Sequence, residues 1–523
     1  MPTYLAEFSF QEPEDCLNPN YTMNEQKNIL NNPVQMLGLW SLYHLIVWTL
    51  LPMLCNTCLP LDSIEAVMWG SQWQWGYDKH PPLSAWAPEL FTNLLGDSGL
   101  YLLSQICVVL AGIGIYKLGR LFKLNARQCI FAVLLLDTIY YYQFISVEYN
   151  VNIMQMPLWA WGWFFGIDAI QNKRFVSWIG LGACIALGAL TKYIAVFMLV
   201  PLFAAWWKRG ELKKVMLSPG LYVAGAVSLL IFLPHLIWMM NHDWMTISYG
   251  LKRGGTEKLW WHHLVHPLEF IFTQSAILAP LILVSLLGKF RSLEKGDRIP
   301  GTMAMGIGCF IFMAIFALLT GMAPVTMWAA PMPLAIGLWL VPRFNLDQFP
   351  KTAFTFIALM SSIFIIGYGV TYGAGPLIRK KPHRVNYPGK ELARQVEVQW
   401  HKKSDEPLNY IIADEFLGGI VNHYGNDNAA VMIRGTLERS AYLSDEAVRK
   451  NGALILWLKA FDADAEKQVN FRKAFIKDAD GKRITERYPT AEELPDLVIP
   501  WPRRKDGMAG RYGIAYISPQ NSN

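Results

Sequence analysis

The chain has 523 residues, of which 53% are hydrophobic and only 16% are charged, and it contains 21 tryptophans. This composition is too apolar and too aromatic for a soluble enzyme of this length, and it indicates a membrane protein. The formal net charge of +6 implies no nucleic-acid partner, because the basic residues are spread over loops between apolar blocks and over the C-terminal segment.

The apolar residues form blocks of about 20 residues, a length that crosses a hydrocarbon core of about 30 Å. We predict eleven transmembrane spans, at residues 35–54, 99–118, 128–146, 151–170, 175–191, 193–207, 219–240, 265–287, 302–320, 325–342 and 353–374. The residues before the first block are polar and acidic, and that block is long enough to remain as a span. No cleavable signal peptide is therefore predicted.

Lysines and arginines concentrate in alternate loops, which predicts the orientation of the chain. If the N-terminal segment 1–34 is cytoplasmic, the inner loops carry most of them. The outer loops before residue 376 carry only Lys79, Lys192, Lys252, Arg253 and Lys258. An odd number of spans then places the C-terminal segment outside. We expect a multi-pass membrane protein with its N-terminus on the cytoplasmic side and its C-terminal domain on the outer side.

The first outer loop, residues 55–98, is too apolar for a free loop and is rich in tryptophan. Its tryptophans are typical of a segment that lies at the bilayer surface. Asp62 and Glu65 are three residues apart, so they would share one face of a helix. The two carboxylates can form a catalytic pair or can cap a short interfacial helix, and the spacing favours neither interpretation.

The composition becomes charged and polar from about residue 376, which predicts a soluble extracytoplasmic α/β domain over residues 376–523. Strand-like runs are predicted at Asn409–Ala413, Ala430–Arg434, Ala453–Leu458 and Tyr512–Ser518, and helix-like runs at Glu391–Lys402 and Asp462–Lys477. Asp414, Glu415 and His423 could form a site there, but acidic residues after a strand more often cap a helix. We expect a structural role for them.

Several collinear motifs extend over residues 60–340. They are Asp62-Ser-Ile-Glu-Ala with Trp69, Trp75-Gly-Tyr-Asp-Lys-His-Pro-Pro-Leu-Ser-Ala-Trp86, Glu148-Tyr-Asn-Val-Asn-Ile with Pro157-Leu-Trp159, Leu190-Thr-Lys-Tyr193, Pro234-His-Leu-Ile-Trp238, Gln274 and Met327-Trp-Ala-Ala-Pro331. In these motifs and their order along the spans, the chain resembles the polytopic GT-C glycosyltransferases of family 39. This family includes the protein mannosyltransferases and the lipid A aminoarabinose transferases, and the likeness is strongest to its bacterial lipopolysaccharide sugar transferases.

The resemblance implies a polytopic α-helical GT-C membrane domain, residues 35–375 here, that takes a sugar from a polyprenyl-phosphate donor. The sugar passes to a hydroxyl of a glycolipid or glycan acceptor on the outer side of the bilayer, with inversion of the anomeric centre. Such a step needs a carboxylate as general base and cations for the departing phosphate. Family members usually carry an Asp-Glu pair, or a lone acidic residue, in the first outer loop. Here Ile64 precedes Glu65, so we rank Glu65 first as base and Asp62 second.

Lys192 is the first candidate for binding the donor phosphate. It falls at the outer junction of two apolar blocks, where an uncompensated charge is costly, and the resembled family places a lysine there too. The alternative interpretation of Lys192 is a lysine at a helix end whose side chain extends to the membrane surface. Lys252 and Arg253 would add positive charge near the carrier. The candidate residues for lining the substrate cavity are Asp78, Lys79, His80, Glu148, Asn150, Asn152 and Tyr193.

Two further function classes compete with the enzyme. A transporter or flippase of lipid-linked sugars would also have many spans, but it would place ionisable residues mid-span and show repeated halves. Here Asp137 and Asp168 are the clearest in-span acids, and the polar motifs cluster on one side of the membrane. This arrangement favours an enzyme that faces the membrane surface. A membrane-anchored scaffold would leave the first-loop motif without a role. No cofactor is implied, and no metal is indicated, because His262, His263 and His266 do not have the spacing of an established ligand set.

Overall fold

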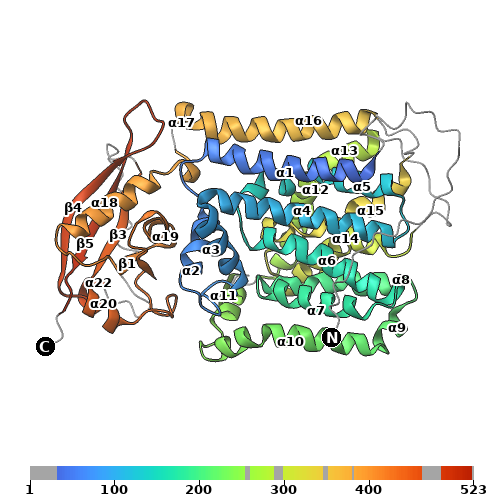
Figure 1. Cartoon of the computed structure of the whole chain (residues 1–523), viewed down its shortest axis with the longest axis horizontal. Coiled ribbons are helices and arrows are strands. Elements are labelled where there is room, and N and C mark those ends of the chain that lie inside the picture. Colours follow the sequence, from blue (N-terminus) through green and yellow to red (C-terminus); the bar gives the residue numbers. More distant parts are fainter. Residues whose placement is uncertain are drawn as a thin grey trace, which may run out of the picture.

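The structure, a computed structural model, describes residues 32–253, 259–287, 299–344, 351–379, 382–461 and 484–520. It consists of a long helix bundle and a smaller sheet region at one end of the bundle, as Figure 1 shows. The predicted helix Asp462–Lys477, the basic residues of the predicted inner loop at 289–298 and residues 1–31 of the predicted N-terminal segment lie outside the described residues.

The bundle is built from α-helices that follow one another along the chain. They are α1 (Pro33–Cys55), α2 (Leu61–Gly70), α3 (Leu83–Leu95), α4 (Asp97–Leu121), α5 (Ala126–Leu134), α6 (Val151–Gln171), α7 (Phe175–Ala189), α8 (Leu199–Lys208), α9 (Leu212–Met216), α10 (Pro219–Met240), α11 (Met245–Arg253), α12 (His262–Ile277), α13 (Ala279–Leu287), α14 (Thr302–Thr320), α15 (Ile336–Leu340), α16 (Lys351–Tyr368) and α17 (Gly375–Ile378). Short 3-10 turns connect several of them, including Ile145–Val147 before α6 and Tyr193–Met198 before α8.

Five helical segments among the described residues are long and apolar enough to cross a bilayer, and up to seven are if each of two bent pairs counts as one span. Helical structure lies at the other predicted spans too. The span predicted at residues 151–170 is the continuous helix α6, whereas the rest are shorter or broken pieces. Residues 325–342, for example, form only short helices, because proline at positions 331, 333 and 342 interrupts helical hydrogen bonding. The chain is thus a multi-pass helical protein, and the count of eleven stays a prediction.

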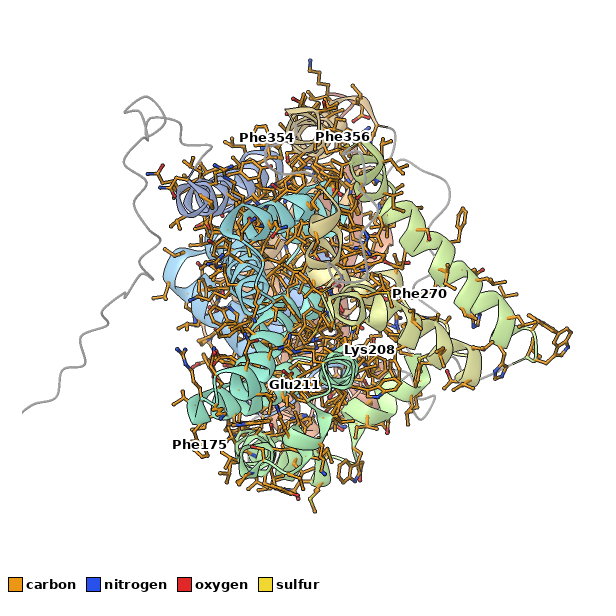
Figure 2. The ribbon with its side chains drawn as sticks, turned by 90° about the vertical axis from the view of Figure 1, so that its right-hand side faces the viewer. Phe175, Lys208, Glu211, Phe270, Phe354 and Phe356 are labelled. Atoms are coloured by element: carbon orange, nitrogen blue, oxygen red, sulfur yellow. The ribbon has the colours of Figure 1, made fainter. Side chains whose placement is uncertain are left out.

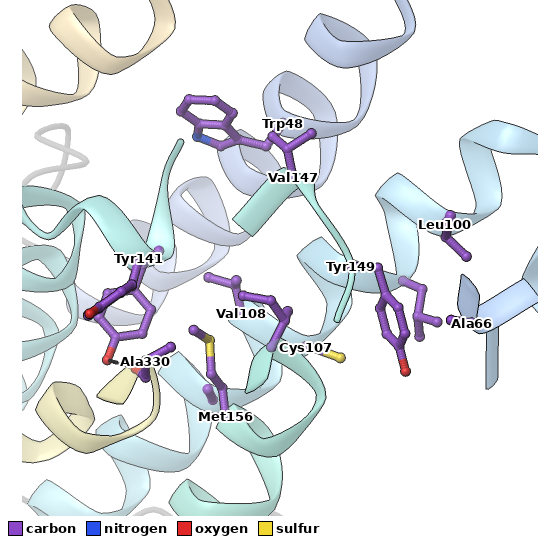
Figure 3. Close-up of a cluster of buried hydrophobic side chains, with 14 of the residues drawn as sticks. Trp48, Ala66, Leu100, Cys107, Val108, Tyr141, Val147, Tyr149, Met156 and Ala330 are labelled. Carbon is purple, nitrogen blue, oxygen red and sulfur yellow. Dashed lines mark hydrogen bonds between the residues drawn. The ribbon is translucent and has the colours of Figure 1, made fainter. Parts of the chain in front are cut away.

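The faces of the outer helices are those of a protein that contacts lipid. Leu42, Ile46 and Leu50 of α1 are about half exposed, whereas Trp40 and Trp48 on its other face are buried. In a bilayer the exposed apolar face is solvated by acyl chains, so the bundle is held together by packing on its inner face. Figure 3 shows part of this inner core, which reaches from Trp48 on α1 to Ala66 on α2.

The two ends of the bundle differ. The short helices α2, α3 and α11 lie at the end that carries the sheet region, and α8 and α9 lie at the opposite end (Figure 1). Figure 2 views that opposite end, where Lys208 and Glu211 are found. The first outer loop and the C-terminal region therefore share one side of the bundle.

The C-terminal region has helices on both faces of a five-stranded sheet of order β2-β1-β3-β5-β4. Its elements are α18 (Gly389–His401), β1 (Tyr410–Ala413), α19 (Glu415–Tyr424), β2 (Ala430–Ile433), α20 (Asp445–Asn451), β3 (Ala453–Ala460), α22 (Ile484–Arg487), β4 (Ala491–Pro500) and β5 (Ala509–Ile517). Strands β2, β1 and β3 are parallel, with Ile411 opposite both Val431 and Leu454, and β5 and β4 add antiparallel partners. Helix α19 packs between this sheet and α2.

Strand β4 was not among the predicted strands. Its sequence contains three carboxylates and Pro495, a composition more typical of a loop. It is tolerated because β4 is an edge strand, where charged side chains face water, and because Pro495 lies where the pairing with β5 shifts between Leu494 and Leu497.

Candidate active site

A cavity of about 670 Å³ opens between the first outer loop and the helix bundle. Helix α2, the loop before α3, the start of α6, the 3-10 turn after Lys192, helix α11 and the segment after α14 all contribute to its wall. Its polar and aromatic lining residues are Asp62, Glu65, Trp69, Lys79, His80, Ser84, Tyr149, Asn150, Asn152, Lys192, Tyr193, Phe197, Thr246, Tyr249, Arg253, Phe316 and Trp328. Volumes of this order are typical of small-molecule sites.

Helix α2 presents both first-loop carboxylates to the cavity. Pro60 precedes the helix, and Asp62 lies in its first turn, where a negative charge interacts favourably with the helix dipole. Asp62, Glu65 and Trp69 follow at intervals of three and four residues, and all three line the cavity. The residues between them, Ser63 and Ile64, are buried against the rest of the protein.

Glu65 is committed to an ion pair. Lys79 Nζ lies 2.6 Å from Glu65 Oε1 and 3.4 Å from Glu415 Oε1 of helix α19. Burial raises the pKa of Glu65 to about 7, although the adjacent Lys79 ammonium opposes the rise. If Glu65 accepted a proton, it would lose its negative charge and with it the ion pair to Lys79.

Asp62 differs from Glu65 in its contacts. Within the described part of the chain its carboxylate has no hydrogen-bond or ion-pair partner, and only its backbone N–H donates, to Glu148 Oε1 at 3.3 Å. Burial raises the pKa of Asp62, while the charges of Lys79 and Lys192 act in the opposite direction. Burial raises the pKa of Glu148 to about 7 as well, with a further contribution from Asp62.

Lys192 lines the cavity from the helix bundle. Its Nζ donates to Asn152 Oδ1 at 2.9 Å and lies 4.9 Å from the centre of the Trp328 ring. Asn150, which caps the start of α6, in turn accepts from the Asn152 side chain at 3.0 Å. Burial lowers the pKa of Lys192 to about 7, although Asp62 opposes the fall. An anion that entered the cavity would favour the charged ammonium.

The other predicted residues divide into two groups. Lys79, His80, Asn150, Asn152, Tyr193 and Arg253 line the cavity, whereas Asp78, Glu148 and Lys252 are not among its lining residues. Burial lowers the pKa of His80 well below its usual value, so this imidazole is neutral. The Tyr193 hydroxyl is held by His235 Nε2 at 2.8 Å, which fixes the phenol at the cavity wall.

Some residues of the site were missed by sequence reasoning. Tyr249 and Trp328 line the cavity as aromatic platforms, and only the Met327-Trp motif gave a signal for one of them. Glu415 and Arg439 reach the first outer loop from the C-terminal region. The Asp414–Glu415 pair was noticed but expected to be structural. That expectation describes Asp414, whose Oδ1 caps α19, but Glu415 contacts Lys79.

The two acidic residues within the predicted spans have hydrogen-bond partners inside the protein. Asp137 accepts from Trp40 Nε1 at 3.0 Å and lies 2.9 Å from His44 Nε2, and Asp168 accepts from Asn172 and Ser177. Such paired groups hold helices together. In the region of the three histidines, His263 and His266 contact the backbone carbonyls of Leu318 and Gly321, and no group of metal-ligating side chains is found among the described residues.

Comparison with known proteins supports a glycosyltransferase. Residues 79–238 match the model of the dolichyl-phosphate-mannose-protein mannosyltransferase family. Two proteins of Rhizobium johnstonii (strain DSM 114642 / LMG 32736 / 3841) are each 22% identical. The lipid A galacturonosyltransferase RgtD aligns with 45% of this chain, which spans only 50% of RgtD. The lipopolysaccharide core galacturonosyltransferase RgtA aligns over 88% of this chain and 93% of its own length.

The fold is shared with solved structures. ArnT from Cupriavidus metallidurans, in its crystal structure with undecaprenyl phosphate, has a TM-score of 0.58 at 13% identity, with 93% of this chain and 98% of ArnT covered. The mycobacterial arabinofuranosyltransferase AftD has a TM-score of 0.50 at 11% identity, with 92% of this chain and 40% of AftD covered. None of these proteins supports the transporter alternative. In its matched segment, its two curated relatives and its fold, the chain is similar to GT-C-type membrane glycosyltransferases such as those of family 39.

Proposed function

We propose that the chain transfers a sugar from a polyprenyl-phosphate carrier to a hydroxyl of a lipopolysaccharide acceptor, lipid A or its core, with Asp62 as general base. The observation that carries this proposal is the arrangement of charge in the cavity. A carboxylate without an ionic partner in the described structure, Asp62, shares the cavity with the Lys192 ammonium. Glu65 was ranked first from the sequence, but its carboxylate is occupied by the ion pair with Lys79, so we propose Asp62 as the base instead.

The reaction needs one proton transfer and one displacement. Asp62 accepts the proton of the acceptor hydroxyl, and the oxygen forms a bond to the anomeric carbon while the bond from that carbon to the phosphate oxygen breaks. The polyprenyl phosphate leaves with the electron pair of that bond. Lys192 and Arg253 stabilise the negative charge that develops on the phosphate, so a second catalytic acid is not required. Attack from the side opposite the phosphate inverts the anomeric centre.

The relatives guide the choice of substrates. The names of RgtD and RgtA describe transfer of galacturonic acid to lipid A and to the lipopolysaccharide core, so a polyprenyl-phosphate hexuronic acid is the first donor to test. The solved ArnT complex holds undecaprenyl phosphate, which supports a carrier of this class. We place the protein in the bacterial inner membrane, with the cavity and the C-terminal domain in the periplasm, as the loop charges predict.

The test compares the two carboxylates of α2 in purified full-length protein supplied with donor and acceptor. Asp62→Asn should lower the transfer rate by about 10²- to 10⁴-fold, the usual contribution of a general base. Glu65→Gln should lower it less, because Asp62 is retained. Glu89→Gln is the matched control, since Glu89 is a buried carboxylate of α3 that does not line the cavity. Full activity of Asp62→Asn would exclude the proposed base.

The acceptor is tested in the cell. Mass analysis of lipid A and core from a deletion strain should show the loss of one sugar residue, restored by the wild-type chain and not by Asp62→Asn. Unchanged glycolipids would contradict a lipopolysaccharide acceptor.

A further inference from the structure

The C-terminal domain is attached directly to the helix that carries the candidate base. Helix α19 approaches α2 so closely that a Cβ on Gly419 would lie 2.4 Å from Cγ2 of Ile64. At the two ends of this contact, Asn422 Nδ2 donates to Ser71 Oγ at 3.3 Å, and the Tyr424 hydroxyl accepts from the backbone N–H of Leu59 at 2.9 Å. Helix α2 is therefore packed against the domain along its length.

A chain of alternating charges crosses the same contact. Lys79 lies between Glu65 of α2 and Glu415 of α19, at 2.6 and 3.4 Å. Glu415 also accepts from Arg439 at 2.6 Å, and Arg439 donates to Asp78 at 2.7 Å. Lys79, Glu415 and Arg439 thus each have partners of opposite sign on both the domain and the first outer loop.

The ionisation of Glu415 and Lys79 is fixed by these contacts. Burial raises the pKa of Glu415, but Arg439 and Lys79 outweigh it and the pKa falls to about 2, so Glu415 stays ionised. Burial lowers the pKa of Lys79, but Glu65 and Glu415 outweigh it and the net shift is upward. Lys79 is therefore an ammonium ion with two carboxylate partners.

We propose that Glu415, held by Arg439, is a positioning residue that keeps the Lys79 ammonium on Glu65 and away from Asp62, and this role rests on the proposed function. Lysine is a point charge on a flexible stem, and a single carboxylate restrains it weakly. Lys79 and Asp62 line the same cavity. An ammonium that moved onto Asp62 would occupy the lone pairs that must accept the proton of the acceptor hydroxyl.

The fold holds Glu415 rigidly enough for this role. It is the first residue of α19, and the preceding Asp414 caps that helix through bonds from Phe416 N and Leu417 N at 2.9 and 3.0 Å. Arg434 Nε lies 3.1 Å from the second carboxylate oxygen of Glu415. The side chain is thus fixed by cations on both oxygens.

The first experiment needs no catalysis. Reductive methylation of Lys79 is followed by mass spectrometry in the detergent-solubilised full chain, with exposed Lys402 as internal reference. Glu415→Gln should raise the labelling rate of Lys79 several-fold, because a carboxylate that stabilises the unreactive ammonium form and restrains the side chain is lost. Glu415→Asp should restore most of the protection. An unchanged rate in Glu415→Gln would overturn the proposal.

A matched variant separates positioning from general loosening of the domain. Tyr424→Phe removes the bond to Leu59 N at the same contact without touching Lys79. It should leave the labelling of Lys79 within about twofold of wild type. Equal labelling of Lys79 in Tyr424→Phe and Glu415→Gln would show that Glu415 only docks the domain, which overturns the proposal.

The second experiment measures transfer. Glu415→Gln should lower kcat on the order of tenfold while KM for the polyprenyl-phosphate sugar stays within about twofold, because the proton acceptor and not the donor site is affected. Glu415→Asp should recover most of kcat. A wild-type kcat in Glu415→Gln overturns the proposal. Wild-type activity of Asp62→Asn, or absence of transfer by the wild-type chain, contradicts the proposed function instead, and the methylation result stands apart from both.

Discussion

The wall of the cavity formed by the first outer loop and the wall formed by the helix bundle differ in how their charges are compensated. On the loop side, Glu65 and Lys79 are paired with each other and with Glu415. On the bundle side, Lys192 has an amide and an indole ring as neighbours but no ion pair within the described structure. Paired charges hold a fold together, whereas a buried charge without a counterion is costly unless a ligand supplies one. We therefore expect Glu65, Lys79 and Glu415 to have a positioning role and Lys192 to bind the donor phosphate. Asp62 is also on the loop side, but it has no partner in the described structure.

Of the charged groups other than Asp62, the largest effect is expected at Lys192 on the bundle side. Lys192→Met should lower kcat/KM for the polyprenyl-phosphate donor by about 10²-fold, since it removes a cation aimed at developing charge. Steady-state kinetics in detergent measure the change, with Lys402→Met on the surface of the C-terminal domain as control. A loss no larger than that of the control would show that the bundle side does not bind the phosphate.

The neighbouring cations of α11 offer a sharper contrast. Arg253 lines the cavity and Lys252 does not, although both were predicted from the sequence to bind the donor phosphate. Arg253→Gln should lower kcat/KM about tenfold, because it removes one charge-assisted hydrogen bond to the phosphate. Lys252→Gln should lower kcat/KM by less than about twofold. Equal effects in the same donor titration would mean that α11 contributes only general positive charge.

The pH dependence should reflect both walls. Activity rises with pH through the raised pKa of Asp62, because only the carboxylate accepts a proton, and falls when Lys192, whose pKa lies at about 7, loses its charge. In Lys192→Arg the guanidinium stays protonated, so the basic limb should move upward or disappear while the acidic limb stays. A basic limb at the wild-type position in this variant would assign it to another group.

The smallest effect on turnover is expected at the domain contact. Gly419→Ala adds a Cβ that meets Ile64, and it should destabilise the docked domain by about 1–3 kcal/mol, as overpacking does. Thermal unfolding and limited proteolysis report the change. Gly225→Ala in α10, where a Cβ would meet nothing within 4 Å, is the matched control. Equal stability of both variants would contradict a tightly packed contact.

Local patterns in the sequence determined much of this protein. The length of the apolar blocks predicted a multi-pass helical protein, because hydrocarbon thickness sets helix length. The spacing of Asp62 and Glu65 placed both on one helical face, and the position of Lys192 between two apolar blocks singled out a costly charge. Four of the five strands followed from short β-rich runs, while β4 did not, because its charges are tolerated only at a sheet edge.

The tertiary structure alone decided which charges meet. Glu415 lies 336 positions after Lys79 in the chain, and only the packing of α19 on α2 brings them to 3.4 Å. Lys79 thus lies between Glu65 and Glu415, and Asp62 is left as the carboxylate of α2 without a partner in the described structure. Periodicity is a property of neighbouring residues, so it can place a carboxylate on a face. Whether that carboxylate meets a cation depends on which distant segment the fold lays beside it.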